Sequence, residues 1–196
     1  MVSIRPGWFY HPAEDGRVKS PDRLLDIYYS SVGRNGVLLL NIPPDTKGLI
    51  NAADSKNLQE WKRLIDQTFA QNLLKEAKLA NGGGKNPQAL LDNKSTTYWT
   101  TDGTDTAATI EFKWNSVKTF DVLLLQENIR MGQRIEQFVL EYQDGGEWKK
   151  IAEGTTVGCK RLLRFPPVTA STVRLRITAS RLNPTLAEMG LYKQAR

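Results

Sequence analysis

Cysteine is almost absent from this sequence, which has one such residue, Cys159, in 196. A single cysteine excludes an internal disulfide, although it could pair with another chain or act as a reactive thiol. Because free cysteine is among the residue types most often buried, we expect Cys159 to be a buried structural thiol.

Long apolar runs are also missing. The sequence has no stretch of 18 apolar residues, so we expect no membrane-spanning helix and no membrane partner. The longest such run, GVLLLNI at residues 36–42, has the length of a strand. The N-terminus shows no charged stretch followed by an apolar core, so no signal peptide is visible.

Basic residues are not clustered. The net charge is +6, from 27 Lys and Arg against 21 Asp and Glu, and the sequence has no run of five basic residues. A nucleic-acid-binding protein concentrates its positive charge on one element or groove. We therefore expect a solvated, slightly basic surface and no nucleic-acid partner. A hydrophobic content of 40% indicates ordinary globular material.

Residues 1–73 alternate between strand and helix patterns. The pattern predicts strands in SIRPGWFYH and VLLLNI, the latter covered on both faces, and helices in SPDRLLDIYYSSVGRNG and SKNLQEWKRLIDQTFAQNLL. Ser20 is a suitable helix cap, and Pro21 suits the first helical position. The order indicates βα units of a parallel sheet. Two units leave both sheet edges unpaired, so we interpret residues 1–73 as the closing piece of a larger α/β barrel.

Residues 74–196 follow a different pattern. Short segments with a period of two residues are separated by turn signals such as DGG and PP. In TVRLRITA, Val173, Leu175 and Ile177 alternate with polar residues, so one face of the strand is apolar. Several short strands at this spacing predict an antiparallel β-sandwich.

Two family resemblances cover nearly the whole chain. Residues 3–50, beginning SIRPGWFYHPAED and ending LLLNIPPDTKGLI, resemble the last two βα units of glycoside hydrolase family 29, the α-L-fucosidases. The motifs ALLDNKSTTYWTT and LAEMGLYK resemble those of the discoidin-like, or factor 5/8 type C, domain, close to carbohydrate-binding module family 32. The implied fold class is an α+β composite. It combines the terminal βαβα segment of a (β/α)8-type barrel with an antiparallel, jelly-roll, galactose-binding-like β-sandwich.

The resemblance implies exo-acting, retaining hydrolysis of terminal α-L-fucose from fucosylated glycans. In that family, an Asp nucleophile and a Glu acid/base lie upstream of the segment present here. The chain therefore has no catalytic residue of its own, and we expect it to be inactive alone. Glu14 and Asp15 are neighbours, which rarely converge on one bond from opposite sides, so we interpret them as loop acids. The resemblance also implies a secreted or periplasmic location.

Two residues of the first segment are candidates for substrate binding. The carboxyl ends of barrel strands build the active site, and an aromatic wall suits the C5 methyl group of fucose. Trp8 is the favoured aromatic residue, with Phe9 as the alternative, although Trp8 could also belong to the barrel core. His11 could bind a sugar hydroxyl or serve the structure. Asn41, at the end of VLLLN, could brace the site.

The discoidin-like resemblance implies a structural Ca²⁺ ion, and no cofactor is implied for catalysis. Hard cations prefer oxygen ligands. Carried over by position, the ligands are the carboxylates of Asp92 and Glu188, the hydroxyl and carbonyl of Thr97, and the carbonyls of Ala89, Lys94 and Ala187. The alternative is a metal-free loop that Asp92 caps through hydrogen bonds.

The ligand of the sandwich itself stays open. Candidate sugar-binding residues are Tyr98, Arg130 and Trp148, each of which could equally be a packing residue. The domain could be a carbohydrate-binding module without catalytic activity, a buttress for the barrel, or an adhesion domain. An adhesion domain usually has exposed apolar loop tips, and none are obvious in this sequence. A dimer of the isolated fragment through residues 1–73 is a further expectation, because its apolar strand needs cover.

Overall fold

The computed structural model describes residues 1–196, which form two compact units. Unit 1 comprises Met1–Ala70 together with Gln194–Arg196, and unit 2 comprises Gln71–Lys193. The division lies between Ala70 and Gln71, a few residues before the boundary placed at 73/74 from the sequence.

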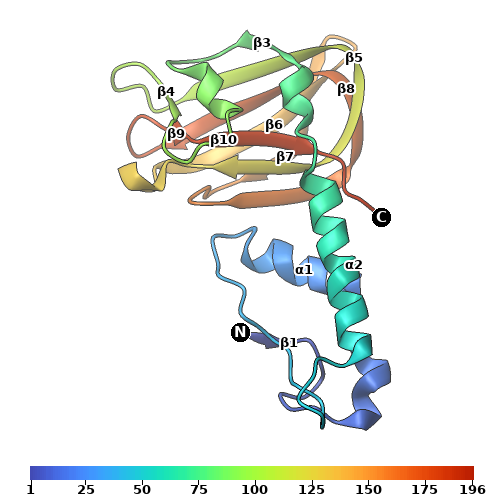
Figure 1. Cartoon of the computed structure of the whole chain (residues 1–196). Coiled ribbons are helices and arrows are strands. Elements are labelled where there is room, and N and C mark those ends of the chain that lie inside the picture. Colours follow the sequence, from blue (N-terminus) through green and yellow to red (C-terminus); the bar gives the residue numbers. More distant parts are fainter. The chain divides into compact units, whose positions relative to one another are not determined.

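Two helices dominate unit 1 (Figure 1), as the sequence predicts: α1 at Pro21–Ser31 and α2 at Ala52–Phe69. Ser20 caps α1 by accepting a hydrogen bond of 3.2 Å from the backbone N–H of Arg23. The ring of Tyr28 on α1 lies 6.4 Å from that of Trp61 on α2, so the aromatic faces of the helices pack together. Neither helix combines the length and apolarity needed to cross a membrane.

The strands of unit 1 are much shorter than predicted. They are β1 at Val2–Ser3 and β2 at Leu40–Asn41, and they pair in parallel with Val2 opposite Leu40. The parallel pairing agrees with the predicted βα order. The predicted VLLLNI strand is reduced to Leu40 and Asn41, and nothing in this chain covers its apolar side chains, because Val37 is 92% exposed and Leu39 is 55% exposed. A strand extends only where a neighbour pairs with it, and this pair has no neighbour in the chain.

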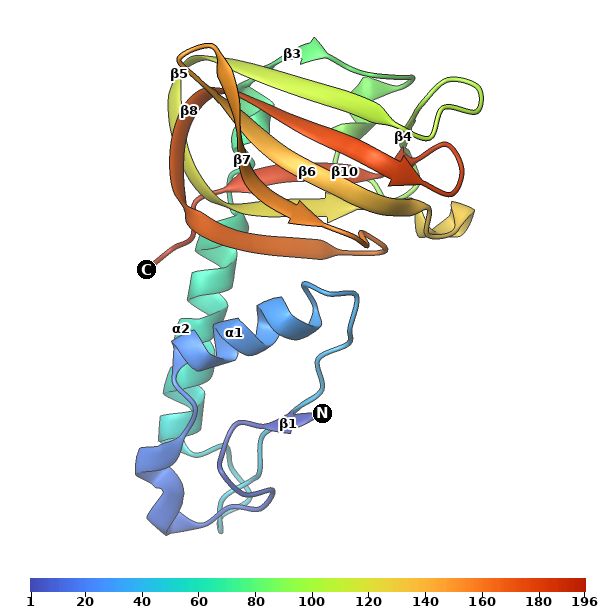
Figure 2. The same cartoon turned by 180° about the vertical axis from the view of Figure 1, so that it is seen from behind.

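Unit 2 is built on one six-stranded antiparallel sheet with the order β10-β5-β8-β6-β7, in which β3 also pairs with β5. A separate pair joins β4 to β9. Figure 2 shows how the long strands bend around a common interior. The strands are β3 Lys78–Asn81, β4 Trp99–Thr100, β5 Ala108–Gln126, β6 Ile135–Asp144, β7 Glu147–Gly154, β8 Arg161–Ser180, β9 Thr185–Leu186 and β10 Glu188–Tyr192.

Strands β5 and β8 each join two segments that the sequence suggests are separate. Their antiparallel pairing continues across two register shifts, one of them between Phe120 and Val122 of β5. Pro166 and Pro167, expected to form a turn, lie within β8 opposite that shift. Proline is tolerated at such bulges because the ladder hydrogen bond is already interrupted there.

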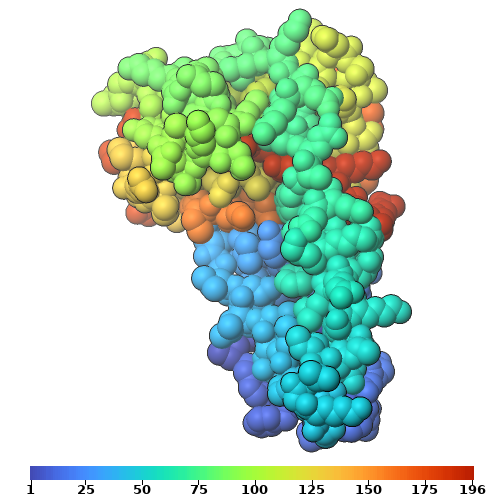
Figure 3. All heavy atoms as spheres, in the orientation of Figure 1, coloured from blue at the N-terminus to red at the C-terminus, as the bar shows by residue number.

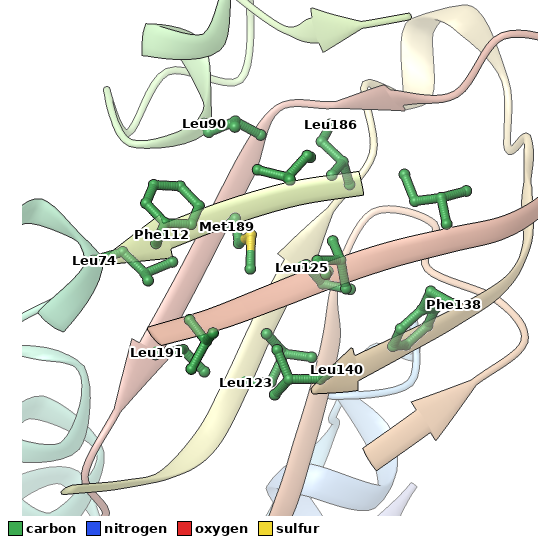
Figure 4. Packing of buried hydrophobic residues seen from close by; sticks show 14 of the residues in the cluster. Leu74, Leu90, Phe112, Leu123, Leu125, Phe138, Leu140, Leu186, Met189 and Leu191 are labelled. Atoms are coloured by element: carbon green, nitrogen blue, oxygen red, sulfur yellow. The ribbon is translucent and has the colours of Figure 1, made fainter. Parts of the chain in front are cut away.

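The core of unit 2 lies between the bent halves of this sheet. Val173 and Leu175 are fully buried and Ile177 is 2% exposed, which confirms the alternation predicted for this strand. Figure 4 shows side chains from β5, β6 and β10 meeting in the interior, among them Leu123, Leu140 and Met189. A core shared by all the long strands fixes the positions of the loops at their ends.

Four short 3₁₀ helices complete the chain: η1 Pro12–Arg17, η2 Leu73–Glu76, η3 Pro87–Leu90 and η4 Ile129–Met131. Cys159 lies in the loop between β7 and β8 and is exposed, so the expectation of a buried thiol was wrong. The neighbouring Val157 and Gly158 are buried instead.

Candidate functional site

The loop that follows β1 carries the two candidate substrate-binding residues of unit 1. Trp8 is 46% exposed and Phe9 is 74% exposed, so neither residue is buried in this chain. Asn41, the last residue of β2, donates hydrogen bonds of 2.8 Å to the carbonyl of Trp8 and 3.1 Å to Ser3 Oγ. The backbone of Trp8 is therefore held where two parallel strands end.

A buried ion pair stabilises the loop that carries Trp8. Arg5 and Asp54 are both fully buried, and Arg5 Nε donates a 2.9 Å hydrogen bond to Asp54 Oδ2. Arg5 Nη1 lies 2.9 Å from Asp15 Oδ1, and the guanidinium carbon lies 4.6 Å from the centre of the Tyr10 ring. Because a buried cation is costly unless it is paired, these contacts fix the course of the loop.

His11, Glu14 and Asp15 make different contacts. The carbonyl of His11 accepts hydrogen bonds from Arg5 Nη1 at 3.4 Å and from the N–H of Glu14 at 2.9 Å, whereas its imidazole is exposed. Asp15 pairs with Arg5 and contacts Tyr10, so it serves the fold. Glu14 and Asp15 lie in the first turn of η1, consistent with loop acids.

The six residues expected to bind Ca²⁺ belong to unit 2 and come from two distant segments. These segments meet where the N–H of Asn93 donates a 2.9 Å hydrogen bond to Glu188 Oε2. Asp92 accepts hydrogen bonds of 2.9 Å from the N–H of Lys94 and 2.6 Å from the hydroxyl of Thr97. No group of three or more His, Cys, Asp or Glu side chains could hold a metal ion. A metal here would depend on two carboxylates, with hydroxyl and carbonyl oxygens. The full set is Ala89, Asp92, Lys94, Thr97, Ala187 and Glu188.

The two carboxylates of this set differ in their electrostatics. Burial raises the pKa of Glu188 to about 7, against the opposing effects of the Asn93 N–H and Lys75, and its side chain is 6% exposed. The hydrogen bond from Thr97 lowers the pKa of Asp92. The bonds of Asp92 are those expected of a metal-free loop, whereas the buried carboxylate of Glu188, with a single hydrogen bond, fits a site for a hard cation.

A cavity of about 520 Å³ lies beside this loop. Its walls come from four segments: residues 93–95, 126–130, 159–160 and 187–188. In the space-filling view, the light-green segment that includes the first wall lies next to the gold segment that includes η4 (Figure 3). Of the three candidate sugar-binding residues, Arg130 lines this cavity. Trp148 instead lies under the guanidinium of Arg174, at 4.0 Å from the ring centre, and the carbonyl of Tyr98 accepts a hydrogen bond from Asn86.

Most of the cavity wall and one exposed apolar patch, Ile129 with Leu182, are not evident from the sequence. Gln126, Asn128 and Lys160 line the cavity, and no spacing in the sequence connects them. The exposed apolar residues Ile129 and Leu182, at 52% and 59%, contradict the expectation that apolar loop tips are absent. Arg134 joins their loops through hydrogen bonds to the carbonyls of Met131 and Asn183.

Both units match known families. Residues 56–189 match the F5/8 type C domain, and residues 1–67 match the alpha-L-fucosidase family. Alpha-L-fucosidase 1 of Arabidopsis thaliana is 38% identical over 201 residues, which cover 97% of this chain and 39% of the relative.

Solved structures agree across both units. The crystal structure of SpGH29 is 39% identical, with a TM-score of 0.89, covering 98% of this chain and 43% of that one. The structure of a GH29 fucosidase from Ruminococcus gnavus in complex with fucose is 32% identical, with a TM-score of 0.90, covering 99% of this chain and 40% of that one. The chain thus spans about two fifths of the length of these relatives.

Proposed function

The chain belongs to the alpha-L-fucosidase family, glycoside hydrolase family 29, and carries an F5/8 type C domain; from this premise we propose that it is the C-terminal part of an exo-acting α-L-fucosidase. The substrate would be a glycan with terminal α-linked L-fucose. The R. gnavus relative, whose structure holds fucose, supports this substrate class.

The observation that carries the proposal is the placement of Trp8. Trp8, whose side chain is exposed, follows one parallel strand, and its backbone carbonyl accepts a hydrogen bond of 2.8 Å from Asn41 at the end of the next. The carboxyl ends of parallel barrel strands are where such enzymes build their sites. In the proposed site, Trp8 packs against the apolar face of fucose and His11 binds a hydroxyl.

Unit 1 supplies the end of the proposed barrel. The outer edges of β1 and β2 are unpaired in this chain, and the exposed side chains of Val37 and Leu39 lie beside β2. Further barrel strands would pair with these edges and cover these side chains. In the isolated chain, a second copy could cover the same surface and form a dimer.

The reaction would be retaining hydrolysis. A carboxylate attacks the anomeric carbon while a carboxylic acid about 5 Å away protonates the leaving oxygen, and water then releases the sugar. Both groups would come from the part of the enzyme before this chain. Asp15 and Asp54 are held by Arg5, so neither replaces them. The chain alone would therefore be inactive.

The proposal also includes a structural Ca²⁺ ion bound by unit 2. Asp92 and Glu188 would supply carboxylate oxygens, and Thr97 and the carbonyls named above the remaining ligands. The buried Glu188 carboxylate, with its single hydrogen bond, supports this assignment. A bound ion would tie the loop at residues 89–97 to β10.

The location of the enzyme would be outside the cytoplasm, secreted or periplasmic, where glycans with terminal fucose are accessible. The alternative function is a carbohydrate-binding module without catalysis, which the separate core of unit 2 supports. Assay of the gene product extended upstream, with 4-nitrophenyl α-L-fucopyranoside, distinguishes them. Turnover supports the fucosidase, and glycan binding without turnover supports the module.

A further inference from the structure

Tyr10 differs from its neighbours in the loop after β1. Trp8 and Phe9 before it and His11 after it are exposed, whereas Tyr10 is half-buried. The guanidinium carbon of Arg5 lies 4.6 Å from the centre of the Tyr10 ring. A guanidinium over an aromatic face is a favourable contact, and this arginine is fully buried. The ring of Tyr10 therefore anchors the loop to the interior of unit 1.

The hydroxyl of Tyr10 makes two further contacts. It donates a hydrogen bond of 3.5 Å to Asp15 Oδ2 and accepts one of 3.3 Å from Asn51 Nδ2. Asn51 also caps α2, because its Oδ1 accepts a 2.9 Å hydrogen bond from the N–H of Ala53. Asp15 belongs to η1 and is paired with Arg5. The hydroxyl therefore connects the loop to the start of an 18-residue helix and to η1.

The backbone on both sides of Tyr10 is held as well. The carbonyl of Trp8 accepts a hydrogen bond of 2.8 Å from Asn41, and the carbonyl of His11 accepts one of 3.4 Å from Arg5 Nη1. Between these two backbone contacts, the side chain of Tyr10 is the anchor that fixes the course of the chain. Without it, the backbone torsion angles between the two carbonyls could change, and the exposed side chains on either side would then point in other directions.

We propose that Tyr10 is a positioning residue of the substrate site. It fixes the directions in which Trp8 and His11 leave the backbone, and it does not itself touch the sugar. The inference rests on the proposed function, in which these two residues bind fucose. The ring of Tyr10 contributes through its contact with Arg5, and the hydroxyl contributes through its hydrogen bond with Asn51.

The kinetic test uses the gene product extended upstream, with 4-nitrophenyl α-L-fucopyranoside as substrate. Groups that bind the sugar equally in the ground state and the transition state contribute to KM and leave kcat unchanged. We expect Tyr10→Ala to raise KM about tenfold or more while kcat changes less than about threefold. Tyr10→Phe keeps the ring contact with Arg5, so it should recover part of this loss. An unchanged KM in Tyr10→Ala would overturn the proposal.

Thr68→Val is the control that separates positioning from a general loss of stability. Thr68 is 2% exposed, and its hydroxyl donates to the carbonyl of Leu64 and accepts from the N–H of Ala195. The change therefore weakens unit 1 near the end of α2, away from the loop. A partly unfolded enzyme has fewer active molecules, which lowers the apparent kcat and leaves KM unchanged. A KM raised equally in Thr68→Val and Tyr10→Ala would contradict the positioning role.

Hydrogen exchange in the present chain tests the loop independently of catalysis. We expect the backbone amides of residues 7–11 to exchange faster in Tyr10→Ala and at the unaltered rate in Thr68→Val. Unchanged exchange in Tyr10→Ala would overturn the proposal. The kinetic outcomes also separate the two proposals. Absence of turnover by the unaltered extended protein would refute the proposed function and this role together, whereas turnover with an unchanged KM in Tyr10→Ala would refute the role of Tyr10 alone.

Discussion

The side-chain amide of Asn41 donates a hydrogen bond of 2.8 Å to the backbone carbonyl of Trp8, 33 residues earlier in the chain. The same nitrogen lies 3.1 Å from Ser3 Oγ, so one side chain joins the end of β2 to β1 and to the loop that follows it. An exposed indole on a loop would otherwise sample many positions. This contact gives the proposed substrate-binding residue a fixed backbone.

Replacing Asn41 with Ala removes both hydrogen bonds. We expect backbone amides of residues 3–11 to exchange with solvent faster, and the free energy of unfolding to fall by about 1–2 kcal/mol. Hydrogen exchange read by mass spectrometry measures the first effect and urea unfolding the second. Gln59→Ala, on an exposed position of α2, is the control. Unchanged exchange in the Asn41 variant would show that the loop is held by other contacts.

Two aspartates in α2 test the buried ion pair. Asp54→Asn leaves the buried Arg5 without its 2.9 Å partner, so we expect unit 1 to lose about 3–5 kcal/mol of stability or fail to fold. Asp66→Asn breaks an exposed pair with Lys62 in the same helix and should cost less than about 1 kcal/mol. Circular dichroism during thermal unfolding compares the two. Equal losses would contradict a buried, structure-determining pair.

Calcium should stabilise unit 2. At about 100 times its dissociation constant, a ligand specific to the folded state adds about 2.7 kcal/mol, which corresponds to a rise in Tm of about 5–10 °C for a chain of this size. We expect this rise in protein stripped with a chelator, and its loss in Glu188→Gln. Glu147→Gln, on an exposed position of β7, should retain it. A Tm independent of calcium in the unaltered chain supports the metal-free loop capped by Asp92.

Glu127 should contribute more to the stability of unit 2 than its position in a loop suggests. In Glu127→Gln, an NH₂ group replaces one of two oxygens that accept backbone N–H bonds, so at least one buried donor loses its partner. We expect the free energy of unfolding to fall by about 1–3 kcal/mol. Urea unfolding monitored by tryptophan fluorescence measures the loss. A variant as stable as Glu147→Gln would contradict this structural role of Glu127.

Local signals predicted part of this fold well. Ser20 and Pro21 mark the start of α1, and the apolar stripe that includes Tyr28 and Trp61 marks the packed faces of both helices. The alternation through Val173 and Leu175 predicted which face of β8 is buried. These signals lie within one element and need no knowledge of its neighbours.

The remaining features depend on contacts between distant segments. The length of β2 depends on the strands that pair with it. The apolar run around Val37 therefore predicted a longer strand than the structure has. Pro166 matches a turn signal in the sequence. It nevertheless lies within β8, at a register shift where the regular strand pairing is interrupted. Cys159 is exposed because its neighbours Val157 and Gly158 turn inward at the loop. The cavity combines segments as far apart as Asn93 and Glu188, which no spacing pattern could reveal.

The most direct test of the account is fucosidase activity of the extended gene product, measured with 4-nitrophenyl α-L-fucopyranoside beside the present chain. We predict turnover by the extended protein, none by residues 1–196 alone, and a raised KM when Trp8 is replaced by Ala in the extended protein. Turnover by the present chain, or a folded extended protein that releases no nitrophenol, would contradict the assignment of this chain as the C-terminal part of an α-L-fucosidase.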